Sequence, residues 1–280
     1  MPTANGVASH RSVTSLDDIV KISQNLVQAR QAAISLSAFP GVLPSDTKTA
    51  YAIQDRSISE WSDEVAGWKV GGISPSFLER FGAKRLAGPI FKSQTLTTLN
   101  NVAVTAAVFE RGFAAVEAEF ILRTSVPISP KDPKKSSQQL RDCIASVHIG
   151  AEIASSPMSA INELGPGAII SDFGNNGGLI VGPQIVNWHE RAGDDIDVSV
   201  SINGTQVGAI RKSIEDDAFN AFEFLVDLSR SRGIELPAGT LVTCGALSGI
   251  HEVKPGDQSC VVFEELGMLT VEFAKLRPTL

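Results

Sequence analysis

The chain has 280 residues, of which 43% are hydrophobic and 20% charged, a composition typical of a globular protein with a sizeable core. Its formal net charge of −7 and sequence pI near 5.2 argue against a nucleic-acid partner, which needs a basic surface. The three cysteines are far apart and form no CxxC pair. This pattern argues against a zinc site and favours a reducing compartment over a disulfide framework.

No signal for membrane insertion or export is present. The apolar runs stay below the roughly 18 residues of a membrane span. Residues 1–14 are small and polar and lack the apolar segment of a signal peptide. We therefore expect a flexible tail over residues 1–14 and a cytoplasmic protein with no membrane partner.

Two amphipathic helices are expected next. Ser15 is a good N-cap, and apolar residues at helical spacing continue to about residue 37. A second helix begins after Asp46. From about residue 95 onward strands predominate, with a few helices between them. The pattern predicts a mixed α/β fold, divided into a helical N-terminal part over residues 15–95 and a strand-rich domain over residues 96–280.

Several shorter signals support this outline. Ser74-Pro75 predicts the start of a short helix, and residues 138–145 a second short helix. Asn203-Gly204, between alternating strands, suits the turn of a β-hairpin. Residues 215–232 read as a helix that Gly233 ends.

Lys69 lies in the strand-like run of residues 65–72, on the face opposite Trp68 and Val70. Two interpretations remain open for it. A lysine flanked by Trp, Val and glycines can extend its stem along a sheet edge with its ammonium group in water. It can also be a cation placed to meet an anionic substrate or to move a proton.

Two acids one residue apart stand in the strand-like run of residues 116–122. Alternation puts Glu117 and Glu119 on one face, roughly 7 Å apart along the backbone. Two carboxylates repel each other by about 1 kcal/mol at 4 Å in water and by more where water is excluded. Solvent, a proton, a basic neighbour or a metal ion must compensate. Glu152 occupies another strand-like run, and a third converging carboxylate would make a site that suits a hard cation such as Mg²⁺.

The order of motifs along residues 16–273 resembles the 2-oxopent-4-enoate hydratase and 4-oxalocrotonate decarboxylase family of the fumarylacetoacetate hydrolase superfamily. Each motif is weak alone, but the ordered set is fairly specific. The motifs are Tyr51-Ala52-Ile53-Gln54, Gly67-Trp68-Lys69-Val70-Gly71, Val116-Glu117-Ala118-Glu119, Val147-His148, Glu152-Ile153, Asp172, Thr243 with Gly245-Ala246-Leu247, and Lys254-Pro255-Gly256-Asp257.

The resemblance implies a fold, a cofactor and an assembly. The fold is a helical N-terminal part followed by a mixed β-roll of the fumarylacetoacetate hydrolase C-terminal type. Glu117, Glu119 and Glu152 would bind Mg²⁺ or Mn²⁺, which chelates the 2-oxo (or 2-enol) oxygen and a carboxylate oxygen of the substrate. The assembly would be a homo-oligomer, a dimer or a ring of dimers, and a complex with a related decarboxylase or hydratase is a further expectation.

The resemblance also assigns roles to other residues. Lys69 is expected to be catalytic, in proton transfer, and to bind substrate. Thr243 and His148 are further substrate-binding candidates, although His148 fits a hydrogen-bonded structural histidine equally well. Many relatives carry an acid and an aromatic residue where this chain has Leu86-Ala87, before Gly88. Since that acid takes part in the proton chemistry, Lys69, Asp172, His148 or a metal-bound water must act in its place here, and Lys69 and Asp172 are the catalytic candidates.

These features predict a lyase of aromatic-compound catabolism. It would add water to a small 2-hydroxy-2,4-dienoate, or to the 2-oxo-4-enoate tautomer of that acid, and give a 4-hydroxy-2-oxo acid. Decarboxylation of a 2-oxo-3-enedioate is the alternative. The apolar stretch of residues 86–89 favours a mono-acid, because it offers a second carboxylate no partner. An acylpyruvate hydrolase is disfavoured, since no histidine lies between His10 and His148. A non-catalytic partner subunit of such a lyase is a further alternative.

Overall fold

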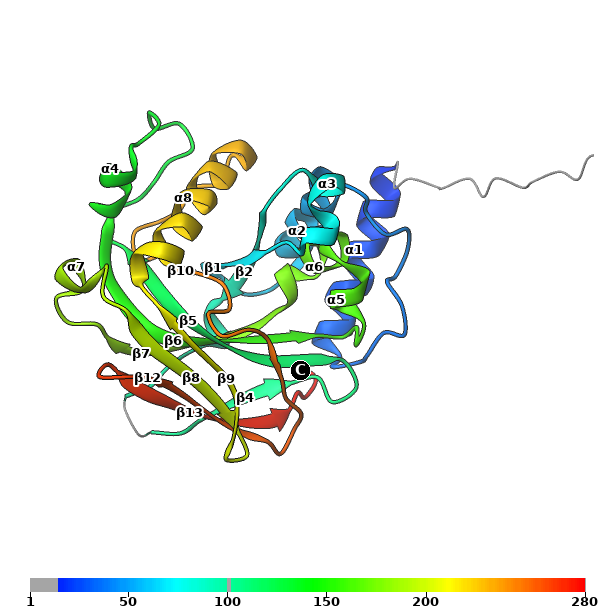
Figure 1. Cartoon of the computed structure of the whole chain (residues 1–280). Helices are drawn as coiled ribbons and strands as arrows, with labels where there is room; N and C mark the ends of the chain where they lie inside the picture. Colours follow the sequence, from blue (N-terminus) through cyan, green and yellow to red (C-terminus); the bar gives the residue numbers. More distant parts are fainter. Residues whose placement is uncertain (1–14, 100–101, 280) are drawn as a thin grey trace, which may run out of the picture.

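The computed structural model describes residues 15–99 and 102–279 (Figure 1). The tail expected over residues 1–14 lies outside them. Within the described chain, no helix has both the length and the apolar character to cross a membrane. The helices are α1 (Leu16–Gln31), α2 (Thr47–Glu60), α3 (Leu78–Phe81), α4 (Ser137–Arg141), α5 (Ile161–Leu164), α6 (Pro166–Ser171), α7 (Trp188–Arg191) and α8 (Ile214–Arg232).

The strands form two sheets, each of mixed parallel and antiparallel pairing. The larger sheet has the order β2-β1-β10-β5-β6-β7-β3, with β11 paired to β5. The smaller sheet has the order β4-β13-β12-β8-β9. The strands of the larger sheet are β1 (Val65–Gly72), β2 (Arg85–Phe91), β3 (Thr95–Thr97), β5 (Phe113–Thr124), β6 (Ile144–Ser156), β7 (Asn176–Gln184), β10 (Leu241–Thr243) and β11 (His251–Glu252). Those of the smaller sheet are β4 (Val104–Val108), β8 (Ile196–Ile202), β9 (Thr205–Lys212), β12 (Gln258–Phe263) and β13 (Gly267–Lys275).

Alternation along β5 separates two layers of the molecule. Val116, Ala118 and Phe120 belong to the main core, which also contains residues of α8 and of the smaller sheet. Ala115 belongs instead to a second cluster beneath α1, α5 and α6. In Figure 1, α1, α2, α5 and α6 lie together on one side of the molecule, and α8 lies apart from them. The acids of β5 therefore face the layer that the N-terminal helices cover.

Most of the predicted elements are present. Ser15 caps α1 and Asp46 caps α2. The turn at Asn203-Gly204 joins β8 to β9 in a hairpin. The prediction for α1 was wrong at its end, because the helix stops at Gln31 rather than near residue 37. Ala33 adopts a left-handed φ of 52°, and the Ile34 N–H donates to the Ala29 carbonyl across the turn.

The other predicted helices also have observed counterparts. The stretch from Pro75 forms a 3₁₀ turn that runs into α3, and α8 ends at Gly233. The short helix predicted over residues 138–145 is α4, which is limited to Ser137–Arg141. It stops early because Ile144 already begins β6 and pairs with β5.

The division between residues 95 and 96 remains a prediction. The larger sheet is continuous across it, because β1 and β3 pair with strands that come later in the chain, and β2 pairs with β1. β1 pairs in parallel with β10, and β3 in parallel with β7. The helical N-terminal part therefore contributes strands, as well as helices, to the layer that carries the acids.

Candidate metal centre

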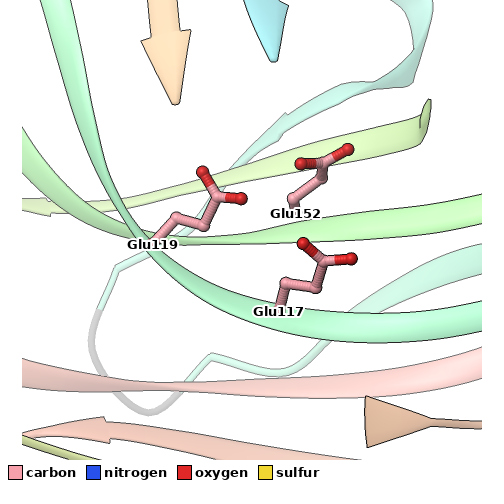
Figure 2. Close-up of side chains that lie close together, drawn as sticks. All are labelled: Glu117, Glu119 and Glu152. Atoms are coloured by element: carbon pink, nitrogen blue, oxygen red, sulfur yellow. The ribbon is translucent and has the colours of Figure 1, made fainter. Parts of the chain in front are cut away.

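Three glutamates from two neighbouring strands meet on one face of the larger sheet (Figure 2). β5 and β6 are antiparallel, and their register sets Glu117 directly opposite Glu152 and Glu119 opposite Gly150. Residues directly opposite one another point to the same face. One carboxylate oxygen from each acid lies within 4.8 Å of the others. The convergence predicted from the sequence is therefore present.

The glutamate triad (Glu117, Glu119 and Glu152) is buried. Glu119 and Glu152 are fully inaccessible and Glu117 is 5% exposed, so the triad is not a solvated acidic face. Burial raises the pKa of Glu117 to about 7. Burial, followed by the charges of Glu152 and Glu117, raises the pKa of Glu119 well above its ordinary value. The fold therefore holds negative charge where only a positive charge or protons can stabilise it.

Lys69 provides one positive charge. Its Nζ lies 3.2 Å from Oε1 of Glu152, and the residue is only 6% exposed. Burial alone would lower the pKa of Lys69, but the carboxylates of Glu152, Glu117 and Glu119 outweigh burial and raise it. The ammonium group is therefore inside the site and protonated, and Lys69 is not a sheet-edge lysine with its charge in water.

Two glycines allow the lysine stem to lie in this position. A Cβ on Gly174 would stand 3.0 Å from Cδ of Lys69 and 2.8 Å from Cα of Gly88. A Cβ on Gly88 would overlap the Phe173 carbonyl at 2.1 Å. The segment between α6 and β7 thus packs directly on β2 and on the lysine stem, which only residues without a side chain permit.

Two oxygens of the triad have no hydrogen bond within the described chain: Oε1 of Glu119 and Oε2 of Glu152. The other oxygen of each is used, since Gly245 N–H donates to Glu119 Oε2 at 3.0 Å and Asn176 Nδ2 donates to Glu152 Oε1 at 3.1 Å. A buried carboxylate oxygen without a partner is costly. Hard carboxylate oxygens are the ligands that Mg²⁺ and Mn²⁺ prefer, so the residues present fit such an ion.

Thr243 lies on the same face of the sheet. It ends β10, pairs with Ile121 of β5, and is completely buried. The Thr243 side chain lies close enough to Glu119 to lower the pKa of that carboxyl, although its Oγ1 makes no hydrogen bond of ordinary geometry to the described residues. A hydroxyl can both donate and accept, so Thr243 remains a candidate for substrate binding.

The structure does not bring the side chain of Asp172 to the triad as a free acid. Arg30 donates to both of its carboxylate oxygens, at 2.6 and 2.9 Å, and Ser156 Oγ donates at 2.6 Å. His148 is likewise engaged, with Nε2 3.0 Å from Ser146 Oγ and Nδ1 3.1 Å from the Gly182 carbonyl. The catalytic role of Asp172 and the substrate-binding role of His148 stay predictions, and these contacts favour a structural role for each.

Sequence reasoning missed three residues. Arg30 looked like an ordinary basic residue in the last turn of α1, and Asn176 like a turn former. Arg85 was overlooked next to the missing acid, yet its Nη1 donates to the Cys244 carbonyl at 3.2 Å and lies 3.9 Å from the position of a Cβ on Gly245. The available signal was Asp172, since a buried acid in an apolar run requires a cation.

Two packed mixed sheets with N-terminal helices define the class of the protein as a mixed α/β roll, as expected. The family model for the fumarylacetoacetate (FAA) hydrolase C-terminal domain matches residues 92–274, and the chain belongs to this family. The resemblance noted from the motifs is thereby confirmed at the level of the superfamily. Among curated proteins, no sequence matches the chain.

Solved structures share the fold. A 4-oxalocrotonate decarboxylase from Pseudomonas putida G7, complexed with magnesium and adipate, superposes with a TM-score of 0.77 at 18% identity. The match covers 94% of this chain and 100% of that one. A fumarylpyruvate hydrolase from Pseudomonas aeruginosa, in complex with Mn²⁺ and pyruvate, gives a TM-score of 0.55 at 14% identity and covers 75% of this chain and 89% of that one. The first likeness extends over the N-terminal helices as well as the β-roll.

Proposed function

We propose that this protein is a divalent-metal-dependent lyase that acts on a small 2-oxo or 2-hydroxy-dienoic acid. The observation that carries the proposal is the buried glutamate triad, with two carboxylate oxygens that have no hydrogen bond and a protonated lysine 3.2 Å from the third acid. Solved structures of the same fold contain magnesium, calcium or Mn²⁺ together with small organic acids. These complexes support the choice of ligand class.

The proposed roles follow from the contacts. Glu117, Glu119 and Glu152 would hold Mg²⁺ or Mn²⁺. When bound, the ion would act as a Lewis acid on the 2-oxo oxygen of the substrate, favouring the dienolate form. Lys69 holds a proton beside this position and can deliver it to the substrate. The Thr243 hydroxyl would donate to the substrate carboxylate, and burial of the whole cluster excludes water from it.

Among the reactions open to such a site, we favour decarboxylation of a 2-oxo-3-enedioate. The bond to the distal carboxylate breaks, carbon dioxide leaves, and the electron pair enters the dienolate, which becomes a 2-hydroxy-2,4-dienoate on protonation at the 2-oxygen. This reaction requires no acid at the position of Leu86. Leu86 is buried, with Cδ1 3.9 Å from the position of a Cβ on Gly71 beside Lys69.

Arg85 is the candidate cation for the second carboxylate of a di-acid substrate. The expectation of a mono-acid assumed that residues 86–89 form an apolar wall without a cation. Ala87 instead packs into the main core with Trp68 and Val70. The half-buried guanidinium of Arg85 lies next to Gly245, whose N–H contacts Glu119. A cation near this point can pair with a second carboxylate as the substrate enters.

Hydration of a 2-hydroxy-2,4-dienoate is the second candidate, and the position of the Lys69 ammonium group beside Glu152 supports it. The buried ammonium group could supply the proton that hydration requires at carbon, although no second acid assists it. A hydrolase is less well supported, since both ring nitrogens of His148 are engaged. The motif resemblance further suggests a cytoplasmic homo-oligomer that works in aromatic-compound catabolism, in complex with a related enzyme.

The test is a comparison of two substrates with purified protein and Mg²⁺. We expect 4-oxalocrotonate to release carbon dioxide and yield 2-hydroxypenta-2,4-dienoate, measured by ultraviolet absorbance and product chromatography. Arg85→Gln should raise KM for this di-acid far more than KM for a mono-acid. Hydration of 2-hydroxypenta-2,4-dienoate without carbon dioxide release from 4-oxalocrotonate would assign the second candidate. Turnover of neither substrate would favour the non-catalytic partner subunit.

A further inference from the structure

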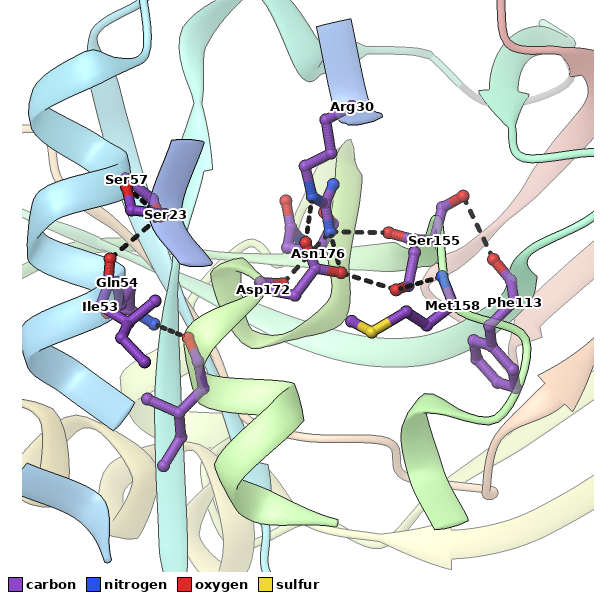
Figure 3. Close-up of polar contacts among 12 residues, drawn as sticks. Ser23, Arg30, Ile53, Gln54, Ser57, Phe113, Ser155, Met158, Asp172 and Asn176 are labelled. Carbon is purple, nitrogen blue, oxygen red and sulfur yellow. Dashed lines mark hydrogen bonds and ion pairs between the residues drawn. The ribbon is translucent and has the colours of Figure 1, made fainter. Parts of the chain in front are cut away.

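Arg30 is a buried arginine at the end of α1, 6% exposed, and its guanidinium is enclosed by hydrogen-bond acceptors (Figure 3). Besides the two carboxylate oxygens of Asp172, it donates to the Asp172 carbonyl at 3.1 Å, the Asn176 carbonyl at 2.9 Å and the Ser155 carbonyl at 3.0 Å. Three of these five bonds end on Asp172 and one on Asn176. Arg30 therefore binds both ends of the segment that joins α6 to β7.

This segment has an unusual backbone. Phe173, Gly174 and Asn175 have φ values of 54°, 70° and 63°, three left-handed residues in a row. A residue with a side chain in this region costs roughly 1–2 kcal/mol. The turn is therefore held by its surroundings: the Phe173 ring packs against Phe91 and Trp61, and the Arg30 guanidinium lies 5.2 Å from its centroid.

The same segment contacts the candidate metal centre at two points. Gly174 packs on the Lys69 stem, as described above. Immediately after the turn, Asn176 Nδ2 donates to Oε1 of Glu152, the oxygen that also contacts Lys69. A shift of the turn would therefore change which oxygen of Glu152 is free for a cation and where the lysine ammonium group lies.

We propose that Arg30 is a positioning residue for this centre. It fixes the left-handed turn through Asp172 and the Asn176 carbonyl, and the turn in turn fixes the Asn176 amide and Lys69 against Glu152. The proposal rests on the proposed function in one respect, namely that the positioned Glu152 is a ligand of a divalent metal ion. It gives Asp172 a role in the fold of the site in place of a catalytic one.

A purely stabilising role is a weaker explanation. Buried ion pairs contribute little net stability, because the loss of hydration offsets the attraction between the charges. The planar fork of arginine, however, fixes several acceptors at once, and a lysine cannot reproduce this geometry. Outer-shell partners of metal ligands commonly change metal affinity by about 10–100-fold when they are replaced.

The experiment measures the Mn²⁺ dissociation constant by calorimetric titration and the exchange rate of the Asn175 amide, which donates to the Asp172 carbonyl. Arg30→Lys keeps the charge and loses the fork. We expect its Kd for Mn²⁺ to rise about tenfold and its Asn175 amide to exchange faster. Ile22→Val is the matched control, because Ile22 is a buried residue of α1 in a separate apolar cluster. It should lower Tm and change neither readout.

Two further variants test the route of the effect. In an Asn176→Ala background, Arg30→Lys should change the Kd less than it does in the wild-type background, because the Asn176 amide, one of the two contacts through which it acts, is already absent. Ser156→Ala removes one hydrogen bond to Asp172 and keeps Arg30. It should raise the Kd in the same direction, and it replaces Arg30→Lys if that variant does not fold.

Three outcomes would overturn the inference: an unchanged Kd in the folded Arg30→Lys protein, additive effects of Arg30→Lys and Asn176→Ala, or an equal change in Ile22→Val. If the wild type binds no Mn²⁺, the proposed metal function fails. In that case the exchange rate of the Asn175 amide alone decides whether Arg30 holds the turn. Equal exchange rates in Arg30→Lys and wild type would reject this role.

Discussion

Lys69 is the internal counter-charge of the glutamate triad. It lies on β1, which β10 separates from β5, and only its long stem brings its Nζ to Glu152. The ammonium group balances one of the three possible negative charges. The negative charge that Lys69 leaves unbalanced explains why the site suits a divalent ion. Without such an ion, burial favours the protonated form of the acids.

Replacement of Lys69 should affect chemistry more than binding. If Lys69 moves a proton, Lys69→Ala should lower kcat by roughly 100-fold or more, because general acid–base groups contribute about this much. Steady-state kinetics with the di-acid substrate measures it. A loss carried by KM would show instead that Lys69 only anchors the substrate. Unchanged kcat/KM would contradict a role for Lys69.

The raised carboxyl pKa values predict an unusual pH dependence for metal-free protein. In the folded chain, burial raises the pKa of Glu117 to about 7 and the pKa of Glu119 well above its ordinary value, whereas an unfolded glutamate keeps its ordinary pKa. Between those values the folded state binds more protons than the unfolded state. The free energy of unfolding should therefore fall, by on the order of a few kcal/mol, as pH rises from about 5 to 8.

Thermal unfolding with chelator present measures this dependence. Because a histidine side chain ordinarily titrates in the same window, wild type is compared with Glu119→Gln, which retains every histidine. The variant should be stabilised relative to wild type at pH 8 and much less at pH 5.5. Mg²⁺ should raise the Tm of wild type more at pH 8 than at pH 5.5, because ligands must lose their protons to bind metal. A Tm difference independent of pH would contradict the raised pKa values.

At the scale of elements, the turn between α6 and β7 links the N-terminal helices to the triad. Gly174 is the point of closest approach, where the turn contacts both β2 and the lysine stem. Its φ of 70° and the absence of space for a Cβ are separate constraints, and each can be tested with a different glycine.

Gly174→Ala should lower kcat at least tenfold, because the added methyl displaces the Lys69 stem. Gly233→Ala is the matched control: Gly233 has the same φ of 70° at the end of α8, and nothing lies within 4 Å of its Cβ position. Both variants should lose about 1–2 kcal/mol of stability from the left-handed backbone. Equal activity in the two variants would show that the turn does not position Lys69.

Much of this arrangement could be predicted from sequence. A period of two placed Glu117 and Glu119 on one face, strand-like runs added Glu152 and Lys69 as candidates, and the motif order assigned their roles. The Glu117–Glu152 register could not be read from spacing, because it depends on pairing between strands about 30 residues apart. Arg30 was missed for a related reason. Three of its five acceptors are backbone carbonyls, of residues 155, 172 and 176, and a sequence carries no local signal for such contacts. Only the Asp172 carboxylate, which accepts the other two bonds, gave a signal.

At the scale of the whole molecule, the N-terminal part supplies residues that surround the site. β1 brings Lys69, β2 covers it, and α1 brings Arg30. The division of the chain at residue 95 therefore separates the triad from its counter-charge. The structural likeness to the decarboxylase, which extends over 94% of this chain, fits a unit that includes both parts.

A fragment of residues 96–280 should not fold alone. It loses β1, the parallel neighbour of β10, and the core residues Trp68 and Val70. Circular dichroism and urea unfolding should show no cooperative transition for the fragment and a single one for the full chain. A cooperatively folded fragment would support the predicted domain boundary instead.

The central claim is that the glutamate triad binds one divalent ion, and calorimetric titration of Mn²⁺ into chelator-treated protein tests it most directly. We predict one ion per chain. Glu152→Gln should weaken binding more than the roughly 10–100-fold expected for an outer-shell partner, since it removes a ligand. Glu163→Gln, at an exposed glutamate of α5, should bind as wild type does. Absence of binding to wild type, or binding that Glu152→Gln leaves unchanged, would contradict the account.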